Sequence, residues 1–226
     1  MTLTDTAPTT IADEPDPGTA IEELTARLFI SGVQAMELCA IYLGDRLGLY
    51  RSMATDGPAS ADELATRAGI AERYAREWLQ AQAVAGFVTA DGSDVTTARF
   101  ALSPGVAQVL VDRTHPAHLG GLSQCLAAVG RVLPRLVDAY RTGEPVTYPE
   151  YGPDAVSAQA ALNRPGFANS LVPEWLPAVP DLYTRLTDTE HPATVGDFAC
   201  GAGWASIALA TGLPHLMVVG VDNDEA

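Results

Sequence analysis

A glycine-rich segment near residue 200, which lies between two apolar runs, constrains the fold of this chain more than any other feature. The apolar run 193–198 predicts a strand, a tight loop follows it, and residues 204–211 predict a helix. The run 217–221 predicts a second apolar strand, which ends at Asp222. This order is typical of the β-α-β unit that opens a doubly wound, parallel sheet.

The loop of this unit predicts a site for a nucleoside. Gly201 and Gly203 carry no Cβ, so the backbone can approach a ligand closely, and the following helix points its first N–H groups at the loop. Asp222 follows about 20 residues later, at the carboxyl end of the second predicted strand. An acidic residue in that place is suited to accept hydrogen bonds from two ribose hydroxyls.

The residues around the loop favour S-adenosyl-L-methionine over a dinucleotide. A dinucleotide fingerprint needs a third glycine three residues after Gly203, where this chain has Ser206. Asp197, inside the first strand, suits a positive charge such as an ammonium or a sulfonium and suits a pyrophosphate badly. S-adenosyl-L-methionine carries both positive groups.

The first half of the chain predicts a winged helix. Ser60 followed by Glu63 is a capping box, and Gly69 predicts a helix end. The pair Asp91-Gly92 is a hairpin-turn signal between two short strand candidates. Before these elements, one helix with an apolar stripe is expected within residues 35–53, and it carries Leu38, Ile41, Tyr42 and Leu49. The second helix and the two strands are expected at 71–85, 87–90 and 98–103.

The segments VGDFACGAGW (195–204) and VVGVDND (218–224) resemble motif I and the acidic loop of class I S-adenosylmethionine-dependent methyltransferases. Residues 38–88 resemble the winged-helix dimerisation domain of bacterial small-molecule O-methyltransferases. The resemblance implies a mainly α chain with an α/β part, a homodimer formed with a second copy of the chain, and a small-molecule methyl acceptor. It implies that Asp197, Gly201 and Gly203 line the methionine end, that Asp222 holds the ribose and that Asn223 lies beside the adenine. Ala199, where the family has its first glycine, and Cys200 complete the implied cofactor site.

Composition, which predicts the tail, and the resemblance, which predicts the domains, together divide the chain. We expect a disordered tail, a winged-helix and dimerisation domain, a helical linker with a substrate lid, and the start of a Rossmann-like domain, at 1–20, 21–112, 113–190 and 191–226. The family sheet has seven strands and only two are expected here. The catalytic base is therefore expected outside this chain, no catalytic residue is named, and the chain alone is expected to be inactive.

Composition excludes several other classes. A net charge of −15 repels phosphate backbones and anionic lipid surfaces, so nucleic acid and membranes are not expected partners. Residues 198–221 carry no charged side chain, but glycines and Pro214 break them into pieces too short to span a bilayer. Cys39, Cys125 and Cys200 show no paired spacing, which predicts no disulfide framework and no metal site and fits a cytoplasmic protein.

Two other functions stay open: a winged-helix transcriptional regulator, and a remnant or interaction protein without catalysis. Against the regulator, Arg73 and Arg76 of the second helix alternate with Glu72 and Glu77. His115 and His118 are expected to be exposed or capping rather than metal ligands, and His215 is expected to be solvated. Four aromatic residues either pack a hinge between domains or cover a small-molecule site: Tyr148, Tyr151, Phe167 and Trp175.

Overall fold

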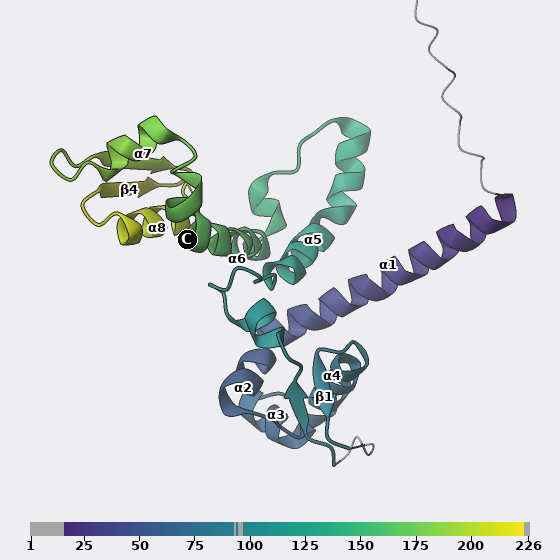
Figure 1. Ribbon diagram of the computed structural model, residues 1–226. Coiled ribbons are helices and arrows are strands. Elements are labelled where there is room, and N and C mark those ends of the chain that lie inside the picture. The colour runs from purple at the N-terminus through teal and green to yellow at the C-terminus, as the bar shows by residue number, and fades with distance from the viewer. Residues whose placement is uncertain (1–15, 93, 95–96, 224–226) are drawn as a thin grey trace, which may run out of the picture. The chain divides into compact units, whose positions relative to one another are not determined.

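The computed structural model describes residues 16–92, 94 and 97–223, and the chain divides into two compact units, Met1–Glu37 and Leu38–Ala226. As predicted, the chain is mainly helical with a short α/β segment (Figure 1). Its strands form a two-stranded antiparallel sheet and a two-stranded parallel sheet. The two units are described separately below.

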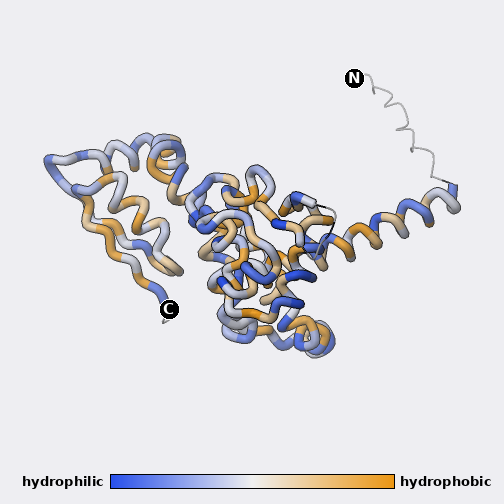
Figure 2. Tube along the Cα trace, turned by 90° about the horizontal axis from the view of Figure 1, so that it is seen from below, coloured by the Kyte–Doolittle hydropathy of each residue, from blue (hydrophilic) through white to orange (hydrophobic). Residues whose placement is uncertain are grey.

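The described part of the first unit is helical. It belongs to α1 (Pro17–Arg46), which begins inside the segment expected to be a tail. Proline is tolerated at a first helical position, where its missing N–H has no helical partner to lose. Residues 1–15 of the expected tail lie outside the described residues. Hydrophobic and hydrophilic turns alternate along α1 (Figure 2), and its exposed apolar side chains before residue 38 are Ile21, Leu24, Leu28, Phe29, Ile30, Val33 and Met36.

Within the described residues, Gly18–Arg46 is the one helix that is long and apolar enough to cross a membrane by length and composition. This segment differs from 198–221, which the sequence singled out, and 198–221 folds into a loop, a helix and a strand.

The second unit opens with the end of α1 and with α2 (Leu49–Asp56). The expectation of one continuous helix within 35–53 is wrong, because the chain turns at Gly48, whose φ of 69° is left-handed. The predicted stripe nevertheless faces the core: Ile41 and Leu49 are buried, and Leu38 and Tyr42 are half-buried.

The winged helix follows as predicted. In α3 (Ala61–Ala68) the Glu63 amide donates to Ser60 Oγ over 3.2 Å, and the Ser60 amide donates to Glu63 Oε2 over 3.0 Å, which confirms the capping box. Gly69 ends this helix with a φ of 66°. The other elements are α4 (Glu72–Val84) and the antiparallel strands β1 (Val88–Ala90) and β2 (Phe100–Leu102). Their shared core includes the fully buried Tyr50, Leu64, Leu79 and Phe100.

Helices fill the middle of the chain, with loops where the prolines and glycines of 141–154 predict them. The elements are a π-helical turn η1 (Ala107–Val111), α5 (Gly121–Thr142), a 3₁₀ turn η2 (Tyr148–Tyr151), α6 (Pro153–Ser170), a π-helical turn η3 (Leu171–Trp175) and α7 (Pro180–Thr187). α5 and α6 pack so closely that a Cβ on Gly121 would lie 2.9 Å from the Ala158 carbonyl oxygen. Polar contacts join both helices to the end of α1: Tyr42 donates to Asp154 over 3.0 Å, and Gln124 donates to Asp45 over 2.7 Å.

The predicted β-α-β unit ends the described chain. β3 (Thr194–Phe198) and β4 (Met217–Val221) are parallel, with Thr194 opposite Met217 and Phe198 opposite Val221. The crossover helix is α8 (Trp204–Gly212). A separate apolar cluster holds this unit against η3 and α7, and its buried members are Leu176, Leu186, Ala193, Leu209, Leu213 and Leu216.

Candidate functional site

The loop between β3 and α8 has a left-handed backbone at three positions. Gly201 and Gly203 have φ angles of 53° and 72°, which glycine adopts without strain. Ala199 has a φ of 58° and is, among the described residues, the one non-glycine residue with a positive φ. An alanine in this region costs roughly 1 kcal/mol or more. The loop therefore holds a conformation in which glycine would be less strained.

Asp222 lies against this loop rather than pointing away from it. Its Oδ2 accepts a hydrogen bond from the Gly201 amide over 2.6 Å, and the Cys200 amide donates to the Val221 carbonyl over 3.2 Å. Gly220 lets the loop come this close, because a Cβ there would lie 3.1 Å from both Cys200 Sγ and Ser206 Oγ. The end of β4 and the glycine loop are thus fixed to each other through backbone groups and one carboxylate.

Asp197 comes from the other strand. Its Oδ2 accepts a hydrogen bond from Ser206 Oγ over 2.7 Å, and Ser206 lies in the first turn of α8. Ser206 stands where a dinucleotide fingerprint would have its third glycine. Ser206, whose presence argues against a dinucleotide, therefore orients Asp197, the carboxylate that favours a positively charged ligand.

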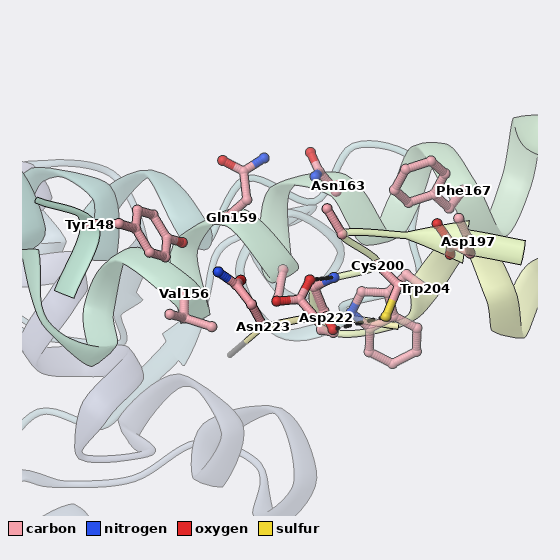
Figure 3. A pocket seen from close by; sticks show the side chains of 15 residues that line it. Tyr148, Val156, Gln159, Asn163, Phe167, Asp197, Cys200, Trp204, Asp222 and Asn223 are labelled. Carbon is pink, nitrogen blue, oxygen red and sulfur yellow. Dashed lines mark hydrogen bonds between the residues drawn. The ribbon is translucent and has the colours of Figure 1, made fainter. Parts of the chain in front are cut away.

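Asp197, Asp222 and most of the glycine loop line a cavity of about 400 Å³, here called the loop cavity (Figure 3). Ligand sites commonly measure roughly 300 to 1,000 Å³. The wall opposite the loop comes from η2 and from one face of α6, where positions 156, 159, 163 and 167 follow helical spacing. The lining residues are Tyr148, Val156, Gln159, Ala160, Asn163, Phe167, Asp197, Ala199, Cys200, Gly201, Ala202, Trp204, Ala205, Asp222 and Asn223.

The charge of the loop cavity has one sign. Among the described residues, two carboxylates, Asp197 and Asp222, line it, and no lysine, arginine or histidine does. Such a surface attracts a ligand with a positive group and repels a pyrophosphate. The amides of Gln159, Asn163 and Asn223 add hydrogen-bonding groups without adding charge.

Six of the seven predicted cofactor residues line the loop cavity: Asp197, Ala199, Cys200, Gly201, Asp222 and Asn223. The seventh, Gly203, is not among the lining residues and instead forms the N-cap of α8. Sequence reasoning missed the α6 wall, although amides at Gln159 and Asn163, one helical turn apart, were a legible signal. That these residues hold a cofactor stays a prediction.

Two of the four aromatic residues line the loop cavity, and whether they cover a ligand there stays a prediction. Tyr148 and Phe167 line the loop cavity, whereas Tyr151 and Trp175 are not among its lining residues. Trp175 packs edge-on against Phe167, with ring centroids 5.9 Å apart. One side chain of this pair thus faces the cavity and the other supports it from behind.

The histidines show no metal site. His115 Nδ1 accepts from the Ala117 amide over 3.1 Å, in the capping role considered for it. His118 is only 4% exposed, so the expectation of an exposed histidine is wrong there. The expectation of a solvated His215 is also wrong, because this residue is half-buried and its Nε2 lies 2.8 Å from the Leu186 carbonyl oxygen. Within the part of the chain that the structure describes, no three His, Cys, Asp or Glu residues are grouped to hold a metal ion.

Comparison with known proteins identifies the first domain. Residues 35–112 match the family model of the Rv2258c-like winged HTH domain, which confirms the predicted winged helix. A comparison with curated protein sequences finds no match.

Solved structures share the fold over most of this chain. The mitomycin 7-O-methyltransferase MmcR is 22% identical, with a TM-score of 0.51, over 91% of this chain and 59% of that chain. Human N-acetylserotonin methyltransferase in complex with SAM is 15% identical, with a TM-score of 0.52, over 93% of this chain and 60% of that chain. LaPhzM is 16% identical, with a TM-score of 0.60, over 89% of this chain and 67% of that chain. The chain thus has the fold of part of these proteins and spans about three fifths of the length of the first two.

Proposed function

We propose that this chain belongs to an S-adenosyl-L-methionine-dependent methyltransferase that acts on a small molecule, and that the loop cavity binds the cofactor. The observation that carries the proposal is a cavity whose described lining has two carboxylates and no basic side chain, formed where a glycine loop follows a parallel strand. The fold shared with methyltransferases, one of them a structure in complex with SAM, supports it.

In this proposal the residues of the chain bind and orient. Asp222, held by the Gly201 amide, accepts hydrogen bonds from the ribose hydroxyls, and Asn223 lies beside the adenine. Asp197, held by Ser206, faces the positive end of the cofactor together with Ala199, Cys200 and Gly201, while Gly203 starts α8. S-adenosyl-L-methionine supplies a methyl group on a sulfonium, and transfer to an acceptor depends mainly on proximity and orientation. No catalytic base is assigned among the described residues.

Equilibrium dialysis with labelled S-adenosyl-L-methionine tests this site. We expect weak, saturable binding, because the outer edge of β4 has no further strand among the described residues to fix it. A hydrogen bond to a charged group contributes roughly 1.5 to 3 kcal/mol, so Asp222→Ala should weaken binding by about tenfold or more. The matched control is Asp138→Ala, on the exposed surface of α5. Equal binding by both variants, or tighter binding of NAD than of S-adenosyl-L-methionine, would contradict the proposal.

The chain is proposed to act as a homodimer through α1. The exposed apolar side chains Leu24, Leu28 and Phe29 lie at helical spacings, and removing such a surface from water is favourable. Light scattering at several concentrations should give the mass of a dimer, and Leu28→Glu should lower it, whereas Glu23→Gln on the same helix should not. A monomeric mass for the unmodified chain at tens of micromolar would refute this proposal.

A membrane span is not favoured for α1, and a cytoplasmic location is proposed. The end of α1 belongs to the folded core, since Ile41 is buried and the Ala40 carbonyl accepts from Trp78 Nε1 over 2.8 Å. The remaining turns carry Glu22, Glu23, Arg27 and Glu37, which are costly in a bilayer. Flotation with neutral vesicles should leave the protein in the aqueous fraction.

DNA binding is also not favoured. Arg73 pairs with Glu77 over 3.2 Å, and Arg99 pairs with Glu63 over 2.7 Å. Arg76 pairs with Glu72. These pairings neutralise three arginines of the winged helix, and the net charge of −15 also opposes a phosphate backbone. Fluorescence anisotropy with duplex DNA should show no salt-sensitive binding, and micromolar binding would favour the regulator instead.

A further inference from the structure

A second cavity, of about 230 Å³, lies beside the loop cavity and is here called the arginine cavity. The two cavities share the lining residues Ala160, Ala202 and Trp204. The remaining lining residues of the arginine cavity are Arg46, Arg113, Gln124, Ser157, Ala161 and Arg164. Three of the 13 basic residues of a chain with a net charge of −15 thus line one small cavity, and none of the lining residues that the structure describes is a carboxylate.

Two of the three guanidinium groups have carboxylate partners that are not among the lining residues. Arg46 pairs with Asp154, which also accepts from the Tyr42 hydroxyl over 3.0 Å. Arg113 lies 3.8 Å from Asp45, a long contact, and the other oxygen of Asp45 accepts from Gln124 Nε2 over 2.7 Å. Asp45 is therefore shared between two partners.

Arg164 differs from the other two arginines. Its guanidinium lies over the ring of Trp204, 3.9 Å from the centroid, and has no carboxylate within 4.0 Å among the described residues. The Nε atom of Arg164 is buried and has no hydrogen-bond partner among the described residues. A guanidinium stacked on an aromatic face keeps its N–H groups in its own plane, where they can bind both oxygens of a carboxylate.

Gln124 adds a second unsatisfied group. Because Asp45 can only accept, the amide nitrogen of Gln124 must face it, and this fixes the orientation of the amide. The Oε1 atom of Gln124 is buried and has no hydrogen-bond partner among the described residues. Buried polar groups are normally satisfied, so these two atoms are candidates for further hydrogen bonds when a polar ligand binds beside them.

His118 does not add charge to this site. Burial, and then the nearby positive charge of Arg113, lower the pKa of His118. It is therefore neutral near pH 7, and the excess positive charge at the cavity comes from arginine alone.

We propose that the arginine cavity binds the carboxylate of a small organic acid, with Arg164 as the principal partner and Arg113 beside it. The shared wall at Trp204 places that acid next to the loop cavity, where a methyl acceptor would have to lie. A nucleophilic atom of the acid other than the bound carboxylate would take the methyl group, the sulfonium would become a neutral thioether, and the proton of the nucleophile would pass to solvent. Only the naming of the acid as acceptor rests on the proposed function, because carboxylate binding itself needs no cofactor.

Calorimetric titration of the full chain with sodium benzoate tests this proposal, with neutral benzamide as the matched probe. We expect saturable binding of benzoate at least about tenfold tighter than that of benzamide, which corresponds to about 1.4 kcal/mol. Arg164→Gln and Arg113→Gln should each weaken benzoate binding, the first by about tenfold or more. Arg73→Gln, on the exposed face of α4, is the control and should bind as the unmodified chain does.

Several outcomes would overturn the proposal. Equal affinity for benzoate and benzamide, or equal binding by Arg164→Gln and Arg73→Gln, would show that the arginines do not recognise the carboxylate. Inorganic phosphate that binds more tightly than benzoate would make this a phosphate site instead. Urea unfolding establishes that each variant is folded, and Arg164→Lys, which keeps the charge but loses the fork of donors, should also bind benzoate more weakly.

The same preparations separate this inference from the proposed function. Asp222→Ala should lose S-adenosyl-L-methionine and keep benzoate, and Arg164→Gln should lose benzoate and keep S-adenosyl-L-methionine. If no variant bound the cofactor while benzoate behaved as expected, the proposed function alone would fail.

Discussion

Replacing Gly44 by alanine should destabilise the second unit, although alanine is the better helix former. Gly44 is buried near the end of α1, and a Cβ there would lie 2.6 Å from Trp78 Cζ2 and would also overlap the Tyr50 ring. Neither ring is free to move away. Tyr50 and Trp78 pack edge-on with centroids 5.0 Å apart, the Tyr50 hydroxyl donates to Gln82, and Trp78 Nε1 donates to the Ala40 carbonyl over 2.8 Å.

The magnitude follows from two opposing terms. Glycine to alanine in a helix interior stabilises by about 1 kcal/mol, whereas overpacking a core costs about 1 to 3 kcal/mol. Because two held rings must shift, we place the cost near the upper end and expect a net loss of about 1 to 2 kcal/mol. Gly130→Ala is the matched control, since Gly130 is inside α5 and a Cβ there would meet nothing within 4 Å. It should stabilise by about 0.5 to 1 kcal/mol.

Thermal and urea unfolding, followed by circular dichroism and tryptophan fluorescence, measure the difference. In a chain of this size 1 kcal/mol shifts Tm by about 2 to 4 °C, so Gly44→Ala should lower Tm while Gly130→Ala raises it. If Gly44→Ala proved as stable as Gly130→Ala, the close packing of α1 against Tyr50 and Trp78 would be refuted.

Three further measurements test the winged helix and its neighbours. Ser60→Ala removes the capping box of α3 and should cost about 1 kcal/mol, whereas Thr142→Ala on exposed α5 should change stability by less than about 0.5 kcal/mol; equal effects would contradict the capping role. Burial, and then the negative charge of Asp45, raise the pKa of Tyr50 above its usual range. The neutral Tyr50 therefore contributes fully to the free energy of unfolding below about pH 10, and this contribution is lost as the pH rises further. Absorbance near 295 nm should show one tyrosine that ionises only on unfolding, and full ionisation of the native protein would exclude this. Burial, and then Arg113, lower the pKa of His118, so the unfolded chain binds more protons and stability should fall as pH drops below about 6.5. The difference in unfolding free energy between pH 7.5 and pH 5 should be smaller in His118→Gln, and an unchanged difference would show that His118 does not cause it.

The elements that sequence predicted best are those fixed by neighbouring residues. The capping box at Ser60 and Glu63 and the end at Gly69 depend on a single turn of helix. The strands 194–198 and 217–221 are short apolar runs whose ends are marked by glycines and an aspartate, so their boundaries were predicted to within a residue or two.

The features that sequence did not predict depend on contacts between distant segments or on one backbone angle. The break at Gly48 was missed because the apolar spacing from Leu38 to Leu49 fits a continuous helix as well as two helices. The α6 wall was missed because only folding brings Gln159 and the glycine loop to the same cavity. The burial of His118 likewise depends on the surrounding fold, which its own neighbours in sequence do not reveal.

The core of the winged helix has a consequence for the order in which the chain folds during synthesis. Its buried members lie between Ile41 and Leu110, so every contact among them is available once that stretch has left the ribosome. The contact of Tyr42 with Asp154 joins residues 112 positions apart and must wait for α6. At about 5 to 20 residues per second, the 44 residues between Leu110 and Asp154 take roughly 2 to 9 seconds to synthesise. This interval is long for a small domain, since such domains commonly fold within a second. The winged helix can therefore fold first and serve as a preformed surface on which α6, and with it both cavities, is then assembled.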